Sequence, residues 1–339
     1  MGKVILENIN PFVDIWYKDC FFMSLMHLLN LQQKIYLLFN EFYIYPKDST
    51  LSIKTLKYDE DNIFKLLPKI GLNYKYKMKI SDIQSEIIKS LNNKEWIILA
   101  VDPFYEDIRK DAYKKLHIPH CLLIYGYSQE VFYIVEQNYS LSLQYKLGEI
   151  SQKSLIESYN GFLEEVRKNS KYIGEDFPVE CKIKSQFPTY FTIKNNNKNI
   201  VIDVKKLINF ILNSIPILLD SLKTLKKQEN YLQKLYKKGE EKQLTELISQ
   251  INKIIIARKI DDFRFEKLTS NNQKILIQES VKNWTYLRTI FSKLLFSKKY
   301  NEEHFINIIL SIRKIFECEN DYYTSLLNID WREIQDGYK

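Results

Sequence analysis

The first residue in this sequence that could do chemistry is a cysteine placed before an apolar segment. Cys20 follows Asp19, and apolar residues recur at helical spacing from there to Phe39. At the start of a helix, unpaired N–H groups and the helix dipole favour the thiolate, the nucleophilic form of cysteine. We therefore predict that Cys20 is a nucleophile whose backbone N–H faces a developing oxyanion. The alternative is a small buried side chain, the usual state of a free cysteine.

A histidine far along the chain could serve as the base. His120 follows Pro119 and opens the apolar run 121–125, so we expect it at the mouth of a strand, facing a cleft. The alternative is a structural histidine at a strand end. His117 lies in an expected loop and is a weaker candidate. His27 falls inside the first expected helix, where packing is its expected role.

A cysteine–histidine pair needs a third group that orients the imidazole. Glu136 ends the strand that follows an expected hairpin, and antiparallel pairing would bring this end near His120. Asn138 lies close behind and is the second candidate, with substrate binding as a further role. Each of the two could instead be a simple turn residue.

Two more acids are candidates for substrate binding. Asp102 comes directly after the apolar run 96–101, so its carboxylate could bind the ammonium group of a substrate. The alternative is a turn residue, because Asp-Pro is a common turn pair. Asp19, immediately before the expected nucleophile, is the other candidate.

The elements that must position these residues belong to the first part of the chain, which reads as mixed α and β. A helix is expected over 20–39, and strands are expected over 96–101, 120–127 and 131–135. From about residue 204 the pattern is helical, with a long segment over 225–256 among others. We predict an α+β protein with an α/β domain over 1–195 and an all-α helical bundle domain over 196–339.

Composition excludes several classes of protein. The 4 cysteines form no CxxC pair, so no metal site is expected. The sequence contains neither a secretory signal nor an apolar stretch long enough for a membrane span, which indicates a cytoplasmic protein with reduced thiols. The net charge of +8 favours an acidic partner. The aromatic residues do not interleave with basic ones in a recognisable module, so nucleic acid is not an expected partner.

The order of a cysteine at a helix start, a histidine at a strand start and a polar group one strand later resembles the papain-like order. The Asp19-Cys20 pair, the Gly126-Tyr127 pair after His120 and the acid at the strand end resemble bacteriocin-processing C39 peptidases. They are more similar still to the carrier-protein acyltransferase family of butirosin biosynthesis and its relatives in nonribosomal-peptide clusters. In that family a segment similar to residues 100–105 precedes the histidine, and a helical region follows.

The resemblance implies a papain-like cysteine protease fold for residues 1–195 and acyl transfer through a thioester. Cys20 would take an acyl or peptidyl chain from the phosphopantetheine arm of a carrier protein, and an amine or diamine would take it from Cys20. Joining chains to diamines, as in closthioamide assembly, is one specific case. His120 would accept the thiol proton first and deprotonate the amine later. The carrier protein is thus the expected partner, and no cofactor of the enzyme's own is implied.

The sequence departs from the family pattern in three places. Glu136 stands where the family has Asp, no Gln occurs in residues 14–19 to serve as oxyanion donor, and no Gly follows Cys20. The missing Gln favours amide synthesis over peptide cleavage. Two other readings stay open, namely a cysteine peptidase or thioesterase with the same residues, and a non-catalytic binding module.

Overall fold

The computed structural model describes residues 2–7, 9–47, 51–57, 63–137, 139, 143–166, 188–196, 204–266 and 270–329. The chain forms two compact units, the sheet unit (residues 1–34 and 61–202) and the helical unit (residues 35–60 and 203–339). An antiparallel sheet with its helices and a set of long C-terminal helices make up the described fold. This confirms the expected α+β class.

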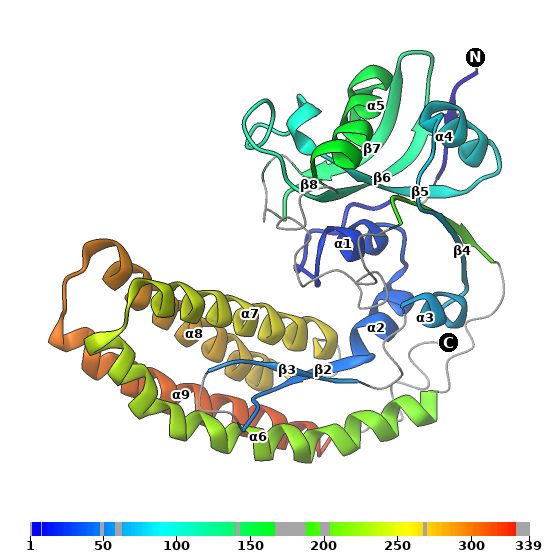
Figure 1. Cartoon of the computed structure of the whole chain (residues 1–339). Helices are drawn as coiled ribbons and strands as arrows, with labels where there is room; N and C mark the ends of the chain where they lie inside the picture. Colours follow the sequence, from blue (N-terminus) through cyan, green and yellow to red (C-terminus); the bar gives the residue numbers. More distant parts are fainter. Residues whose placement is uncertain are drawn as a thin grey trace. The chain divides into compact units, whose positions relative to one another are not determined.

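The sheet unit contains an antiparallel sheet with the strand order β4-β9-β5-β6-β7-β8, and β1 also pairs with β6 (Figure 1). The strands are β1 (Val4–Ile5), β4 (Leu72–Lys77), β5 (Trp96–Val101), β6 (His120–Tyr127), β7 (Val131–Gln137), β8 (Tyr145–Ser151) and β9 (Tyr190–Asn195). The three apolar runs predicted to be strands are β5, β6 and β7, and β6 and β7 pair across a short turn.

Helices cover both faces of this sheet. In Figure 1, α1 (Cys20–Met26) lies on one face, and α4 (Ile83–Asn92) and α5 (Gln152–Gly161) lie on the other. Alternate residues of the central strands face α4 and α5 and form an apolar core with them: Ile97, Leu99, Val101, Leu122, Ile124, Phe132 and Ile134. On the α1 side, the Ser24 hydroxyl donates to the Cys121 carbonyl at 3.3 Å. Because both faces of the sheet are covered at β6, this strand is a continuous apolar run.

The shorter helical segments of this unit are α3 (Ile63–Lys69), η1 (Pro103–Tyr105) and η2 (Phe162–Val166).

The prediction of one helix over 20–39 was wrong. The chain forms two helices, α1 and α2 (Leu31–Phe39), with a break between them. The break has a local cause, because Asn30 Oδ1 accepts from Gln33 N at 2.9 Å and Gln33 Oε1 accepts from Asn30 N at 3.0 Å. This reciprocal pair caps the start of α2. His27 lies in the break, where its Nδ1 accepts from Phe12 N at 2.8 Å.

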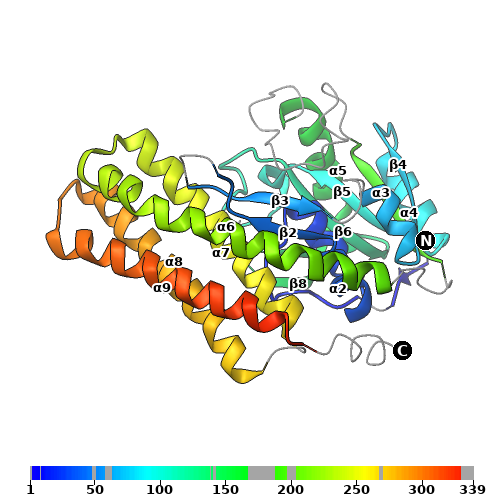
Figure 2. The same ribbon diagram turned by 90° about the horizontal axis from the view of Figure 1, so that it is seen from below.

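The described residues of the helical unit form four long helices, which pack in the order α7, α8, α9, α6 (Figure 2). They are α6 (Val204–Lys238), α7 (Glu241–Phe265), α8 (Asn271–Ser297) and α9 (Glu302–Leu326). The predicted helix over 225–256 was wrong, because the chain breaks at Gly239. A side chain there would lie 2.4 Å from the Leu235 carbonyl, and Glu240 begins a new capping box. Across the described residues, every helix falls short of the length or apolar character that crossing a membrane requires.

The two compact units do not coincide with a single division at residue 195. Residues 35–60 group with the helices and contribute the paired strands β2 (Glu41–Ile44) and β3 (Lys54–Lys57). The Phe42 ring on β2 lies 5.6 Å from the Phe210 ring and 6.2 Å from the Phe265 ring. These two partners of Phe42 lie far along the sequence, so local sequence patterns do not predict the contacts.

A buried ionic network holds the helical unit together. Arg258 on α7 contacts Glu319 on α9 and Asp261, each at 2.9 Å, and all three side chains are fully buried. The Tyr45 hydroxyl and the Trp284 indole N–H also donate to Glu319, at 3.0 and 3.1 Å. Buried charges are tolerated where partners of opposite charge and hydrogen bonds of this kind offset the cost of desolvation.

Replacing Arg258 by Met should lower the free energy of unfolding by about 3–5 kcal/mol, because Glu319 stays buried without its cation while Asp261 keeps only Arg264. Urea unfolding followed by tryptophan fluorescence would measure the change. Arg313→Met is the matched control, because Arg313 pairs with Glu229 on the surface at 3.2 Å. The control should leave the midpoint nearly unchanged. Equal effects of the two variants would contradict the role given to the buried network.

Candidate functional site

Cys20 is the first residue of α1, and its side chain is half-buried. Asp19 precedes it in an extended conformation and caps the helix, because its Oδ1 accepts from Phe22 N at 3.0 Å. The helix has only 7 residues, so its dipole is a smaller influence on the thiol than the side chains around it. Those side chains come from β6 and β7.

His120 begins β6, and Glu136 lies near the end of β7. The imidazole Nε2 of His120 is 2.8 Å from Glu136 Oε2 and 3.0 Å from Oε1, and both residues are buried. The Cys20 thiol interacts with the same imidazole, because each of these two groups shifts the pKa of the other. Since Nε2 is held by the carboxylate, Nδ1 is the nitrogen left for the thiol. The structure thus brings together the predicted nucleophile, base and orienting acid from three separate elements.

The charges at this site favour an ion pair between Cys20 and His120. The hydrogen bond with Cys121 and then the hydrogen-bonded, charged imidazole of His120 outweigh burial and hold the pKa of Cys20 well below its ordinary value. Burial would lower the pKa of His120, but the negative charge of Glu136 and the hydrogen bonds that the imidazolium donates to Cys20 and Glu136 raise it to about 10. Between these two pKa values, the pair is a thiolate facing an imidazolium.

A second layer of buried charge lies behind Glu136 and was missed by the sequence analysis. Arg109 is fully buried, and its Nη1 donates to Glu136 Oε1 at 3.4 Å while its Nε donates to Asp111 Oδ1 at 3.1 Å. Glu106 is also fully buried, and burial together with the charge of Glu136 raises the pKa of Glu106 to about 7. These residues stand in a short charged segment that looks like a solvated loop, so no sequence signal indicated their burial.

Hydrogen-bond counting supports a neutral Glu106. The Ser158 hydroxyl lies 2.7 Å from the Asp102 carbonyl oxygen and 2.9 Å from Glu106 Oε1. A hydroxyl has one proton to give, and a carbonyl oxygen can only accept. If Ser158 donates to the carbonyl, then Glu106 must supply the proton for the second contact. Only the protonated acid can do so.

Asp102 lies next to this layer, and its carboxylate is fully buried. It accepts from Phe104 N at 3.1 Å and Ile118 N at 3.4 Å, and it lies 2.6 Å from His117 Nδ1. The His117 ring stacks on Phe104 with 4.1 Å between ring centroids. The protein's own donors therefore enclose the carboxylate, and the ammonium group expected there would have to displace His117.

The other expected substrate-binding residues are Asp19 and Asn138. Asp19 Oδ2 has no hydrogen-bond partner among the described residues, and burial, then the charge of Cys20, raises the pKa of Asp19 well above its usual range. Asn138 lies outside the described residues. No cluster of His, Cys, Asp and Glu side chains able to hold a metal ion occurs in the described part of the chain.

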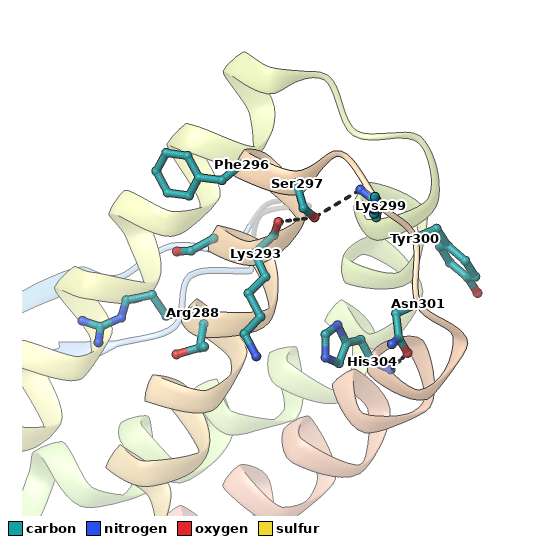
Figure 3. A pocket seen from close by; sticks show the side chains of 10 residues that line it. Arg288, Lys293, Phe296, Ser297, Lys299, Tyr300, Asn301 and His304 are labelled. Carbon is teal, nitrogen blue, oxygen red and sulfur yellow. Dashed lines mark hydrogen bonds between the residues drawn. The ribbon is translucent and has the colours of Figure 1, made fainter.

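The helical unit has a hollow of its own at the turn between α8 and α9 (Figure 3). Its volume is about 730 Å³. Basic and aromatic side chains predominate around it, with no acid among the lining residues that the structure describes: Arg288, Thr289, Ser292, Lys293, Phe296, Ser297, Lys299, Tyr300, Asn301 and His304. We call this surface the basic groove.

No model of a known protein family matches this chain, and no curated protein matches it. Its function is therefore inferred from the geometry of its own residues and from the motifs of its sequence.

Replacing Glu136 by Gln should weaken the ion pair at Cys20. Without the carboxylate charge, the pKa of His120 should fall, and the pKa of Cys20 should rise because a charged imidazole no longer stabilises the thiolate. The pH midpoint for alkylation of Cys20 by iodoacetamide should rise by about one unit, which lowers the rate at mildly acidic pH about tenfold.

Glu149→Gln on β8 is the matched control, because it removes the same charge from an exposed position on a neighbouring strand. It should leave the alkylation midpoint where it is. An unchanged midpoint in Glu136→Gln would show that another group holds the proton on His120.

Proposed function

We propose that this chain is a cysteine-dependent acyltransferase of papain-like fold that moves an acyl chain from a carrier-protein thioester to an amine. The observation that carries the proposal is the convergence of Cys20, His120 and Glu136, with His120 Nε2 held 2.8 Å from Glu136. A thiolate paired with an imidazolium is the activated nucleophile of acyl-transfer enzymes. The choice of carrier and amine comes from the family resemblance.

The first half-reaction would load the enzyme. The Cys20 thiolate attacks the thioester carbonyl, and an oxyanion forms on the carbonyl oxygen. As the oxyanion collapses, the pantetheine thiolate leaves and takes the proton of His120. The products are an acyl thioester on Cys20 and a neutral imidazole.

The second half-reaction would release the product. The amine attacks the acyl carbon, His120 takes a proton from the amine nitrogen, and the Cys20 thiolate leaves. The negative charge of Glu136 raises the pKa of His120, which strengthens the imidazole as a base toward the amine. The remaining alternatives are hydrolysis of the same acyl-enzyme, and binding without catalysis.

Wild-type protein incubated with an acyl-carrier thioester should gain the mass of the acyl group, and Cys20→Ala should not. Cys318→Ala is the matched control, since Cys318 is buried in the helical unit, and it should still gain the mass. Adding a primary amine should discharge the adduct as an amide. Free acid as the product with or without amine would establish a hydrolase, and full turnover by Cys20→Ala would rule out this nucleophile.

We also propose that the basic groove binds the carrier protein. Carrier proteins of this family are acidic, and the groove presents exposed Lys293 and Lys299 together with Arg288 and His304. In Figure 3, Lys293 extends from α8 and His304 comes from α9, so both helices contribute to the surface. Complementary charge of this kind raises association rates and selects partners.

Replacing Lys293 and Lys299 by Glu should lower kcat/KM for the carrier-bound substrate about tenfold, which corresponds to about 1.4 kcal/mol of lost attraction. The value for a small N-acetylcysteamine thioester should not change. Lys89→Glu with Lys153→Glu makes the same change in net charge on exposed positions of α4 and α5 and should affect neither substrate. Equal losses in the two double variants would contradict the groove as the binding surface.

A further inference from the structure

Tyr145 carries a buried hydroxyl for which no hydrogen-bond partner exists among the described residues. Leaving such a group unpaired costs about 1–3 kcal/mol, so a native structure rarely contains one without a reason. Tyr159 and Tyr190 in the same unit are also buried, and both of their hydroxyls have partners. Within the described part of the chain, the lack of a partner for the Tyr145 hydroxyl is therefore a feature that packing does not explain.

The position of Tyr145 places it at the candidate site. It begins β8 opposite Gln137 on β7, so it lies beside the strand end that carries Glu136. Its ring is 4.7 Å from the ring of His27, which follows α1, so it lies on the α1 side of the sheet. Cys20 lies at the other end of this 7-residue helix, and its charge still acts on Tyr145.

The charges of the site act directly on this phenol. Burial, then the negative charges of Glu136 and Cys20, raise the pKa of Tyr145 far above its ordinary value. The hydroxyl therefore keeps its proton near neutral pH. A protonated phenol can donate a hydrogen bond to a negatively charged oxygen.

The proposed chemistry requires such a donor. Attack of a thiolate on a thioester or ester places a negative charge on the carbonyl oxygen, and preorganised donors aimed at that charge are usually the largest catalytic contribution. Papain-like proteases use a Gln upstream of the cysteine for this purpose, and residues 14–19 contain none.

We propose that the Tyr145 hydroxyl is the side-chain oxyanion donor of the Cys20 site, beside the backbone N–H of Cys20. The inference rests on the proposed function only in requiring that an acyl group reacts at Cys20. When the thiolate attacks, the C–S bond forms, the carbonyl π electrons move to oxygen, and the Tyr145 O–H donates to that oxygen without transferring its proton. When the oxyanion collapses, the leaving group takes the electron pair of its bond and a proton from His120. A donor that is unpaired in the resting enzyme and paired only in the transition state contributes to rate and not to ground-state binding.

The test is Tyr145→Phe, which removes the hydroxyl and keeps the ring. Two reactions of Cys20 are compared, namely acylation by p-nitrophenyl acetate, which passes through an oxyanion, and alkylation by iodoacetamide, which does not. Acylation should slow by about 100-fold, as for loss of other oxyanion donors, while the rate and pH midpoint of alkylation should stay as in the wild type. The melting temperature should stay the same or rise, because the removed hydroxyl had no partner among the described residues.

Tyr127→Phe is the matched control, because it removes a hydroxyl that donates to Asn92 at 3.0 Å. It should lower the melting temperature and leave acylation unchanged.

Unchanged acylation in Tyr145→Phe would overturn the proposal, as would parallel losses of acylation and alkylation, which would mean that Tyr145 acts on the thiolate or the fold. Acylation by the activated ester that depends on Tyr145, without any transfer from a carrier to an amine, would support this donor and overturn the transferase. A wild-type Cys20 that is alkylated and never acylated would overturn both.

Discussion

The buried ion pair between His120 and Glu136 is the interaction on which the candidate site depends. A carboxylate can stay charged without water only where donors surround it, and here Arg109 and the backbone N–H of Gln137 supply them, the latter at 2.6 Å. That retained charge keeps the proton on His120, and the resulting cation in turn stabilises the thiolate of Cys20. Each of these charges is stabilised by the next one, so the ionised form of Cys20 depends on the whole series of contacts.

Glu106, the second buried carboxylic acid near the site, does not keep its charge as Glu136 does. Glu106 lies in the same buried region as Glu136, and two carboxylates in such a place do not both ionise easily. Arg109 pairs directly with Glu136, whereas Glu106 has Ser158 as its side-chain partner. The pKa of Glu106 is accordingly raised to about 7, so near neutrality its protonation changes the charge behind the site. The segment between β5 and β6 thus supplies the electrostatic surroundings of the site as well as connecting two strands.

The sequence predicted the parts of this protein that local pattern controls. Strands over 96–101, 120–127 and 131–135 were predictable because apolar runs of strand length end at polar turns, and the β6–β7 hairpin then brings Glu136 to His120. The break between α1 and α2 was not predicted, since the capping exchange of Asn30 and Gln33 is short and stands inside an apolar pattern.

Long-range contacts explain the other differences. Residues 35–60 pair with partners more than a hundred positions away, so nothing nearby marks them as part of the helical unit. Arg109 and Glu106 carry charges that are ordinarily solvated, and only the assembled sheet and α5 bury them. The sequence also did not indicate a role for Tyr145, because the hydrogen-bond partners of a hydroxyl depend on residues that only the folded chain brings near it. The role of Asn138 stays a prediction.

The division of the sheet unit into two stretches of chain has a consequence for the protein during its synthesis. Cys20 leaves the ribosome early, and the residues that follow α2 belong to the helical unit. The strands that carry His120 and Glu136 emerge much later. Until they do, Cys20 is an ordinary thiol with an ordinary pKa, because its low pKa comes from those later residues. The unfinished chain therefore carries a smaller fraction of thiolate at Cys20, and the lowered pKa arises only when β6 is in place.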